Sequence, residues 1–85
     1  MSELSELFTQ AQENIKTLSK KPDDDTMLEL YSLFKQGSDG DVIGDRPGFF
    51  DFIGAAKFDA REKLKGMSSE DAMQKYINKV NDLLG

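Results

Sequence analysis

Apolar residues recur at helical spacing in four separate stretches of the chain, and this pattern limits the fold more than any other feature. The first stretch runs from about Ser5 to Leu18. Its stripe consists of Leu4, Leu7, Phe8, Ala11, Ile15 and Leu18. Residues three and four apart lie on one face of an α-helix, so the stripe predicts a helix with one buried side. Four such stripes in 85 residues predict one all-α domain, residues 1–85, folded as a four-helix bundle.

The second helix is expected to begin at the aspartates 23–25, after Pro22 has blocked the first helix. Gly37 and Gly40 are expected to break it, which leaves one long loop over residues 37–48. The apolar residues cover much of the girth of this helix, so it should be buried on more than one side. They are Met27, Leu28, Leu30, Tyr31, Leu33 and Phe34.

The third helix is expected from about Asp51 to Lys65, with Gly66 as the residue that follows its carboxyl end. The fourth helix begins at Ser68, and Asp71 three residues later resembles a capping box. The stripe of the fourth helix consists of Ala72, Met73, Tyr76, Ile77, Val80, Leu83 and Leu84.

The composition excludes several classes of function. The chain has no cysteine and no histidine, which removes disulfides, thiolate zinc sites and the usual Ser-His-Asp and Cys-His catalysts. No pair of carboxylates lies in an apolar context that favours acid–base work, so an enzyme is not expected. The net charge of −5 argues against nucleic-acid binding, which depends on clustered cations.

No metal, cofactor or membrane span is expected either. The loop aspartates Asp39 and Asp41 are followed by Ile43, which stands where a calcium loop needs an oxygen ligand. No apolar run reaches the length of a membrane-spanning helix. The amino-terminal residues Met1–Leu4 have neither the basic region nor the apolar core of a signal peptide. We therefore expect a cytoplasmic protein.

Two pairs of residues place cations on one helix face. Tyr31 and Lys35 are four apart, and together offer two hydrogen-bond donors to one phosphate group. Lys57 and Arg61 are also four apart, on the third helix, and Lys16 lies near the end of the first. Spacing alone favours the ordinary alternatives, which are a core tyrosine beside a solvated lysine and a solvated basic face.

Phe49, Phe50, Phe52 and Phe58 concentrate four aromatic rings within ten residues. Core packing is the ordinary role for two or three of them. The alternative is that they line a groove for an apolar chain at the edge of the long loop.

Seven segments, taken in order and spacing, resemble the acyl-CoA-binding proteins over nearly the whole chain. They are Pro22–Gln36, Gly40–Asp41, Arg46–Gly48, Ala56–Ala60, Leu64–Ser68, Ala72–Met73 and Tyr76–Val80. The resemblance implies an up-down-down-up arrangement of the four helices, with the long loop between the second and third. It also implies a one-to-one complex with a long-chain acyl-CoA, the role of an acyl-CoA carrier, and a monomer.

The resemblance further assigns binding roles. It places the 3′-phosphate of the adenosine at Tyr31, Lys35 and Lys57 and a head-group contact at Lys16. Tyr76 then lies beside the site. The acyl chain is implied to be covered by Met27 and Leu28.

Other positions depart from the family pattern. Phe34 stands where the family often has a tyrosine beside the adenine, and Gln12 replaces a small alanine on the other side of the base. Two tryptophans are replaced by Phe58 and Arg61, and two lysines by Ile53 and Ala55. Two alternative functions stay open, a helical protein-interaction module and a carboxylate-dependent enzyme or an isomerase accessory domain.

Overall fold

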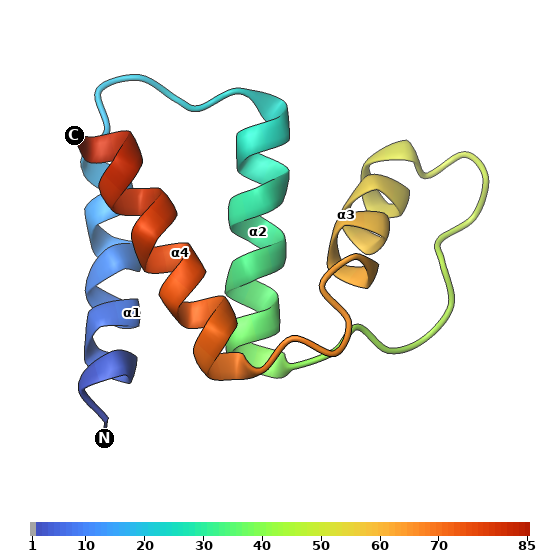
Figure 1. The fold of residues 1–85 in the computed structure, drawn as a ribbon. Helices are drawn as coiled ribbons and strands as arrows, with labels where there is room; N and C mark the ends of the chain where they lie inside the picture. The colour runs from blue at the N-terminus through green and yellow to red at the C-terminus, as the bar shows by residue number, and fades with distance from the viewer. Residues whose placement is uncertain (1) are drawn as a thin grey trace.

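A computed structural model describes residues 2–85. Those residues form four α-helices and one short 3-10 helix, with no β-strand among them (Figure 1). The helices are α1 (Glu3–Asn14), continued by the 3-10 helix η1 (Ile15–Thr17), α2 (Asp24–Asp39), α3 (Phe52–Glu62) and α4 (Ser69–Leu84). The predicted all-α class is confirmed.

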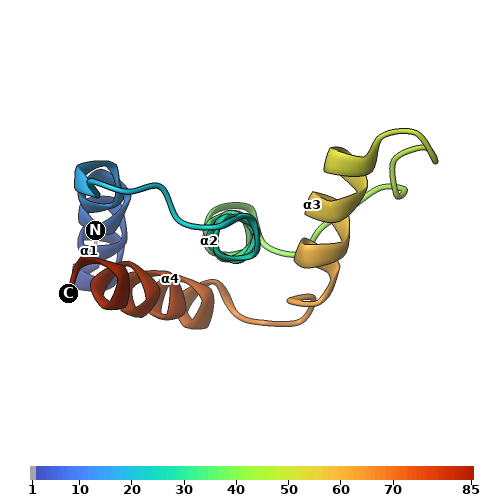
Figure 2. The ribbon, with the colours of Figure 1, turned by 90° about the horizontal axis from the view of Figure 1, so that it is seen from above.

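The helices run up, down, down and up in chain order, as expected (Figure 1). α2 occupies the middle of the molecule, with α4 packed on one side of it and α3 on the other. α1 packs on α4. Seen from above, α3 stands apart from α1 and α4 (Figure 2). The molecule is flat, with principal extents of 37 × 30 × 15 Å.

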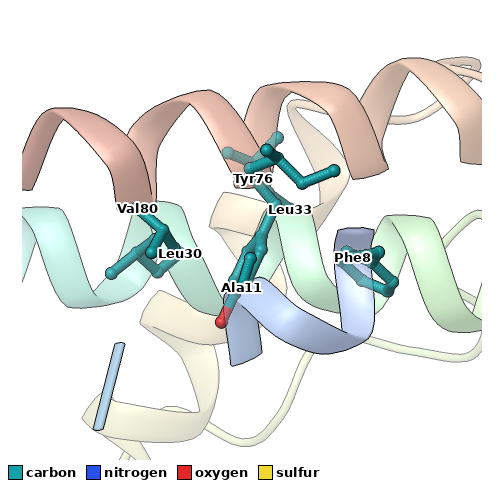
Figure 3. Packing of buried hydrophobic residues seen from close by; sticks show 7 residues of the cluster. Phe8, Ala11, Leu30, Leu33, Tyr76 and Val80 are labelled. Carbon is teal, nitrogen blue, oxygen red and sulfur yellow. The ribbon is translucent and has the colours of Figure 1, made fainter. Parts of the chain in front are cut away.

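The core joins α1, α2 and α4 and leaves α3 outside it. Val80 of α4 is fully buried, and Phe8 of α1 and Leu33 of α2 are nearly so. Figure 3 shows these side chains meeting between the three helices. The buried cluster consists of Phe8, Ala11, Leu30, Leu33, Tyr76, Ile77 and Val80. Within this cluster α1 packs directly against α4.

α1 begins two residues earlier than its stripe predicted. The reason is a cap that the pattern did not use: the Oγ of Ser2 accepts a hydrogen bond from the N–H of Ser5 at 3.1 Å. The predicted end of the first helix near Leu18 is close to the observed one. α1 tightens into η1, and the backbone of Leu18 is extended.

The expected break at Gly37 is wrong. α2 runs through Gly37 to Asp39, and Gly40, with a φ of 84°, is the residue that ends it. Gly37 is buried, and a Cβ there would lie 3.1 Å from atoms of both Phe8 and Met73. A larger residue here would push against these two side chains, so glycine suits the close approach of the three helices. The long loop covers residues 40–51 instead of 37–48.

α3 is shorter than expected and α4 begins as predicted. Asp51 caps α3 by accepting from the N–H of Gly54 at 2.9 Å, and α3 ends at Glu62 instead of Lys65. A turn follows and ends at Gly66, with a φ of 92°. The Oγ of Ser68 accepts from the N–H of Asp71 at 3.1 Å, which confirms the expected cap of α4.

Hydrogen bonds tie the start of the long loop to the end of α2 and to the turn that follows α3. The Oδ1 of Asp41 accepts from the N–H of Gly66 and from the amide of Gln36, each at 2.8 Å. The same Gln36 amide donates to the carbonyl of Met67 at 2.8 Å, and its side chain is buried. These donors, first the Gly66 N–H and then Gln36, hold the pKa of Asp41 below its usual value.

The Asp41 junction makes stability depend on pH. A lowered pKa in the folded state means that the ionised carboxylate stabilises the fold above about pH 4, where it is ionised in the unfolded chain, and that this contribution is lost as the pH falls through the folded pKa. We expect Asp41→Ala to lower the midpoint of urea denaturation, followed by circular dichroism, at about pH 7 and by much less at about pH 3.

The matched control is Asp45→Ala, in the same loop. Asp45 has no side-chain hydrogen bond or ion pair with any residue from 2 to 85, so its removal should leave the midpoint nearly unchanged. An equal loss for Asp41→Ala at both pH values would contradict the role of the ionised carboxylate.

Candidate functional site

One face of α2 turns away from the core and is flanked by two grooves. Met27, Tyr31 and Phe34 lie on this face because they are four and three residues apart. α1 and α4 border the face on one side and α3 on the other. Met27 and Tyr31 line both grooves, so the two grooves meet over α2.

The groove between α1, α2 and α4 is small and has aromatic walls. Its volume is about 280 Å³. It is lined by Gln12, Ile15, Met27, Leu30, Tyr31, Phe34 and Tyr76. The ring centroids of Phe34 and Tyr76 are 6.3 Å apart, and both rings contact Phe8 behind them. The rings of Tyr31 and Phe34 from α2 and of Tyr76 from α4 line the groove and suit a flat aromatic group.

Two residues of this groove have defined polar groups. Burial raises the pKa of the Tyr76 phenol, so the phenol stays neutral near neutral pH. The amide of Gln12 donates to the carbonyl of Phe8 on its own helix at 3.3 Å. The Gln12 side chain therefore lies along α1 and borders the groove while bonded to its own backbone.

The groove between α2 and α3 is larger and has an apolar floor, with a volume of about 570 Å³. It is lined by Lys21, Asp24, Met27, Leu28, Tyr31, Phe52, Ile53, Ala56 and Lys57. Phe52 was named as a possible groove residue, whereas Lys21, Asp24, Ile53 and Ala56 were not predicted as site residues. Their signal was present in the sequence, since Ile53 and Ala56 are three apart and so share one face of α3 with Lys57.

Two lysines lie beside the aromatic side chains of α2. The Nζ of Lys57, on α3, is 5.1 Å from the centroid of the Tyr31 ring, which is a cation–π distance. The Nζ of Lys35 is 5.9 Å from the centroid of the Phe34 ring and 3.4 Å from the Oδ2 of Asp39. Lys57 lines the α2/α3 groove, whereas Lys35 lines neither groove.

Lys16 and Arg61 lie elsewhere. The Nζ of Lys16 is 3.3 Å from the Oε2 of Glu13, on an exposed part of η1, and Lys16 lines neither groove. Arg61 donates from its Nη2 to the carbonyl of Gly40 at 3.4 Å. Arg61 therefore supports the start of the long loop and lines neither groove, whereas Lys57, four residues earlier on the same helix, lines the α2/α3 groove.

Core packing of the phenylalanines is wrong for three of the four. Phe49, Phe50 and Phe52 are largely exposed, while Phe58 is half-buried. Phe52 lines the α2/α3 groove, as the alternative expected. Local hydrophobicity could not reveal this exposure, because it follows from the position of the loop outside the three-helix core.

Two further kinds of feature are absent from residues 2–85. No group of three or more acidic side chains there is arranged to hold a metal ion. None of the helices in that range has the length and apolar character needed to cross a membrane.

The sequence is similar to one family of known proteins over most of its length. The family model described as acyl CoA binding protein matches residues 5–80. The acyl-CoA-binding protein homolog of Manduca sexta is 50% identical over 82 residues, covering 95% of this chain and 91% of the relative. The homolog of Drosophila melanogaster is 49% identical over 81 residues, covering 95% of this chain and 94% of the relative.

Solved structures of similar proteins share the fold. The crystal structure of acyl-CoA-binding protein 2 of Oryza sativa superposes with a TM-score of 0.90 at 41% identity, covering 95% of this chain and 90% of the other. The corresponding protein of Moniliophthora perniciosa gives a TM-score of 0.88 at 42% identity, covering 99% and 81%.

Proposed function

The chain belongs to the acyl-CoA-binding protein family, and we propose that it binds one long-chain acyl-CoA ester across the exposed face of α2 and serves as its carrier. The observation that carries the proposal is the contact of Lys57 with the Tyr31 ring. This contact places a cation of α3 beside a phenol of α2, at the point where an aromatic groove meets an apolar one.

The head group is assigned to the edge formed by Tyr31, Lys35 and Lys57. Two ammonium groups and a phenol provide donors to a 3′-phosphate. The adenine is assigned to the neighbouring groove, between Phe34, Tyr76 and Gln12. A phenyl ring at Phe34 stacks on a base without donating a hydrogen bond to it. Lys16 remains a proposed contact of the outer head group, reached only if its side chain leaves Glu13.

The acyl chain is assigned to the α2/α3 groove, over Met27 and Leu28. Removing each methylene from water contributes roughly 0.8 kcal/mol. Two further carbons then tighten binding by up to about tenfold, until the groove is full. Free coenzyme A lacks this contribution and should bind much more weakly.

Carrier function is proposed over catalysis because of the side chains that surround the groove. The chain has no histidine and no cysteine, so no imidazole is available to activate a nucleophile against the thioester. We propose a monomer that shields the acyl chain and leaves the ester intact.

The phosphate assignment predicts the effect of two lysine variants. Lys35→Ala and Lys57→Ala should each weaken binding of palmitoyl-CoA by about ten- to a hundredfold, because a charge-assisted hydrogen bond contributes about 1.5–3 kcal/mol. Calorimetric titration measures the change. Lys75→Ala on α4, outside both grooves, is the matched control and should bind as the wild type does.

A ligand variant separates the phosphate from general electrostatics. The ester of dephospho-coenzyme A, which lacks the 3′-phosphate, should bind the wild type more weakly and Lys35→Ala with little further loss. Unchanged affinity of both lysine variants for palmitoyl-CoA would rule out this site for the phosphate.

The ion pair of Lys35 with Asp39 predicts a variant that binds more tightly. Asp39 holds the Lys35 amino group at 3.4 Å and brings a negative charge to the phosphate edge. Asp39→Asn should improve affinity about two- to fivefold, a range set by the small energy of partly exposed ion pairs. The fold should tolerate the change, because the negative end of the helix dipole repels a carboxylate at this position, and Asn removes that repulsion.

Asp45→Asn is the control for net charge, because it removes the same charge from a loop residue that has no ion pair with any residue in the range 2–85. A gain of equal size in both variants would show that net charge, and not the Lys35 contact, determines the affinity.

A further inference from the structure

A group of exposed large apolar side chains lies in the long loop and at the start of α3, outside the core. It consists of Ile43, Phe49, Phe50, Phe52 and Ile53, which are 89%, 82%, 86%, 72% and 72% exposed. We call these five residues the apolar tip. Single exposed apolar residues are ordinary, but contiguous ones mark a surface that contacts something apolar.

The tip forms one end of the molecule. The long loop and the start of α3 project away from α1 and from both termini (Figures 1 and 2). The rings of Phe49 and Phe50 pack edge to face on each other, with centroids 5.3 Å apart. Neither ring lines a groove, whereas Phe52 and Ile53 line the α2/α3 groove. The tip is therefore continuous with the opening of that groove.

The tip carries little charge. Residues 43–53 contain Asp45 and Asp51 against Arg46, a net charge of −1, and the whole chain carries −5. An anionic surface would repel the molecule, while a surface without net charge would meet the tip without that penalty.

We propose that the apolar tip docks the protein on a zwitterionic lipid bilayer, with Phe49 and Phe50 inserted at the interface. Aromatic rings favour this region of a bilayer, and an interfacial element needs to enter only about 5–10 Å. A stable protein partner usually contacts about 20–30 residues a side, more than the stretch 43–53 offers. The protruding rings suit a soft surface that deforms around them.

Docking through the tip would bring the opening of the α2/α3 groove next to the lipid surface. If acyl-CoA binding as proposed above is correct, on which this step rests, an acyl chain passes between the bilayer and the groove beside Phe52 and Ile53 without crossing bulk water. The docking itself does not depend on the ligand, since Phe49 and Phe50 lie outside the lining of both ligand grooves.

Vesicle flotation tests the proposal with the full chain and no acyl-CoA. The probes are vesicles of phosphatidylcholine alone and vesicles with added phosphatidylserine. The wild type should float with phosphatidylcholine, equally at about 50 mM and about 500 mM salt, because no charge attraction is involved. For the double variant Phe49→Ser/Phe50→Ser, the partition coefficient onto phosphatidylcholine vesicles should fall by about tenfold or more, because two apolar rings are lost.

The control variant is Leu84→Ser, which removes a 41% exposed apolar side chain at the far end of α4 and should float as the wild type does. Titration of both variants with palmitoyl-CoA below its micelle concentration should give wild-type affinity, which separates docking from ligand binding. Flotation of the double variant with wild-type efficiency would overturn the proposal. Binding only to phosphatidylserine vesicles and its loss in salt, or self-association abolished by the double variant without vesicle binding, would overturn it too.

Discussion

The close packing of α2 against α1 and α4 at Gly37 is the contact on which the rest of the structure depends. A side chain at Gly37 would meet Phe8 and Met73, so the absence of a Cβ lets the three helices share one core. Leu30 and Leu33 of α2 are buried in that core, which leaves Met27 and Tyr31 facing the grooves and Phe34 at the edge of the core. α3, excluded from the core, then packs beside this outward face and completes the second groove.

The features that depend on neighbouring residues along the chain could be predicted from the sequence. The cap at Ser68 and the apolar stripes of α1 and α4 are local patterns, and the structure confirms them. The break at Gly37 was wrong, because the low helix propensity of a glycine is a local effect, while the close packing of Phe8 and Met73 around Gly37 is a tertiary one. The exposure of Phe49 and Phe50 was missed for the same reason, since hydrophobicity does not reveal whether a segment reaches the core. The meeting of Lys57 with Tyr31 joins two helices, and only the family resemblance indicated it.

The electrostatic arrangement explains how an acidic chain can be matched to an anionic ligand. Two of the three lysines assigned to the head group have carboxylate partners on neighbouring turns, Lys16 with Glu13 and Lys35 with Asp39. Within residues 2–85, Lys57 has no carboxylate within 4.0 Å and lies instead over the Tyr31 ring. The Lys57 charge is the least neutralised of the three, which makes α3 the element whose placement matters most for the head group. The loop junction at Asp41 and the ion pair of Arg46 with Asp59 hold α3 in that place.

The central claim is that one α2 face receives both the polar head and the apolar tail of a single ligand. Calorimetric titration of the wild type with palmitoyl-CoA and with free coenzyme A tests it most directly. The account predicts one palmitoyl-CoA bound per chain and a much lower affinity for free coenzyme A, because the tail contributes burial in the α2/α3 groove. Equal affinity for the two ligands would contradict it.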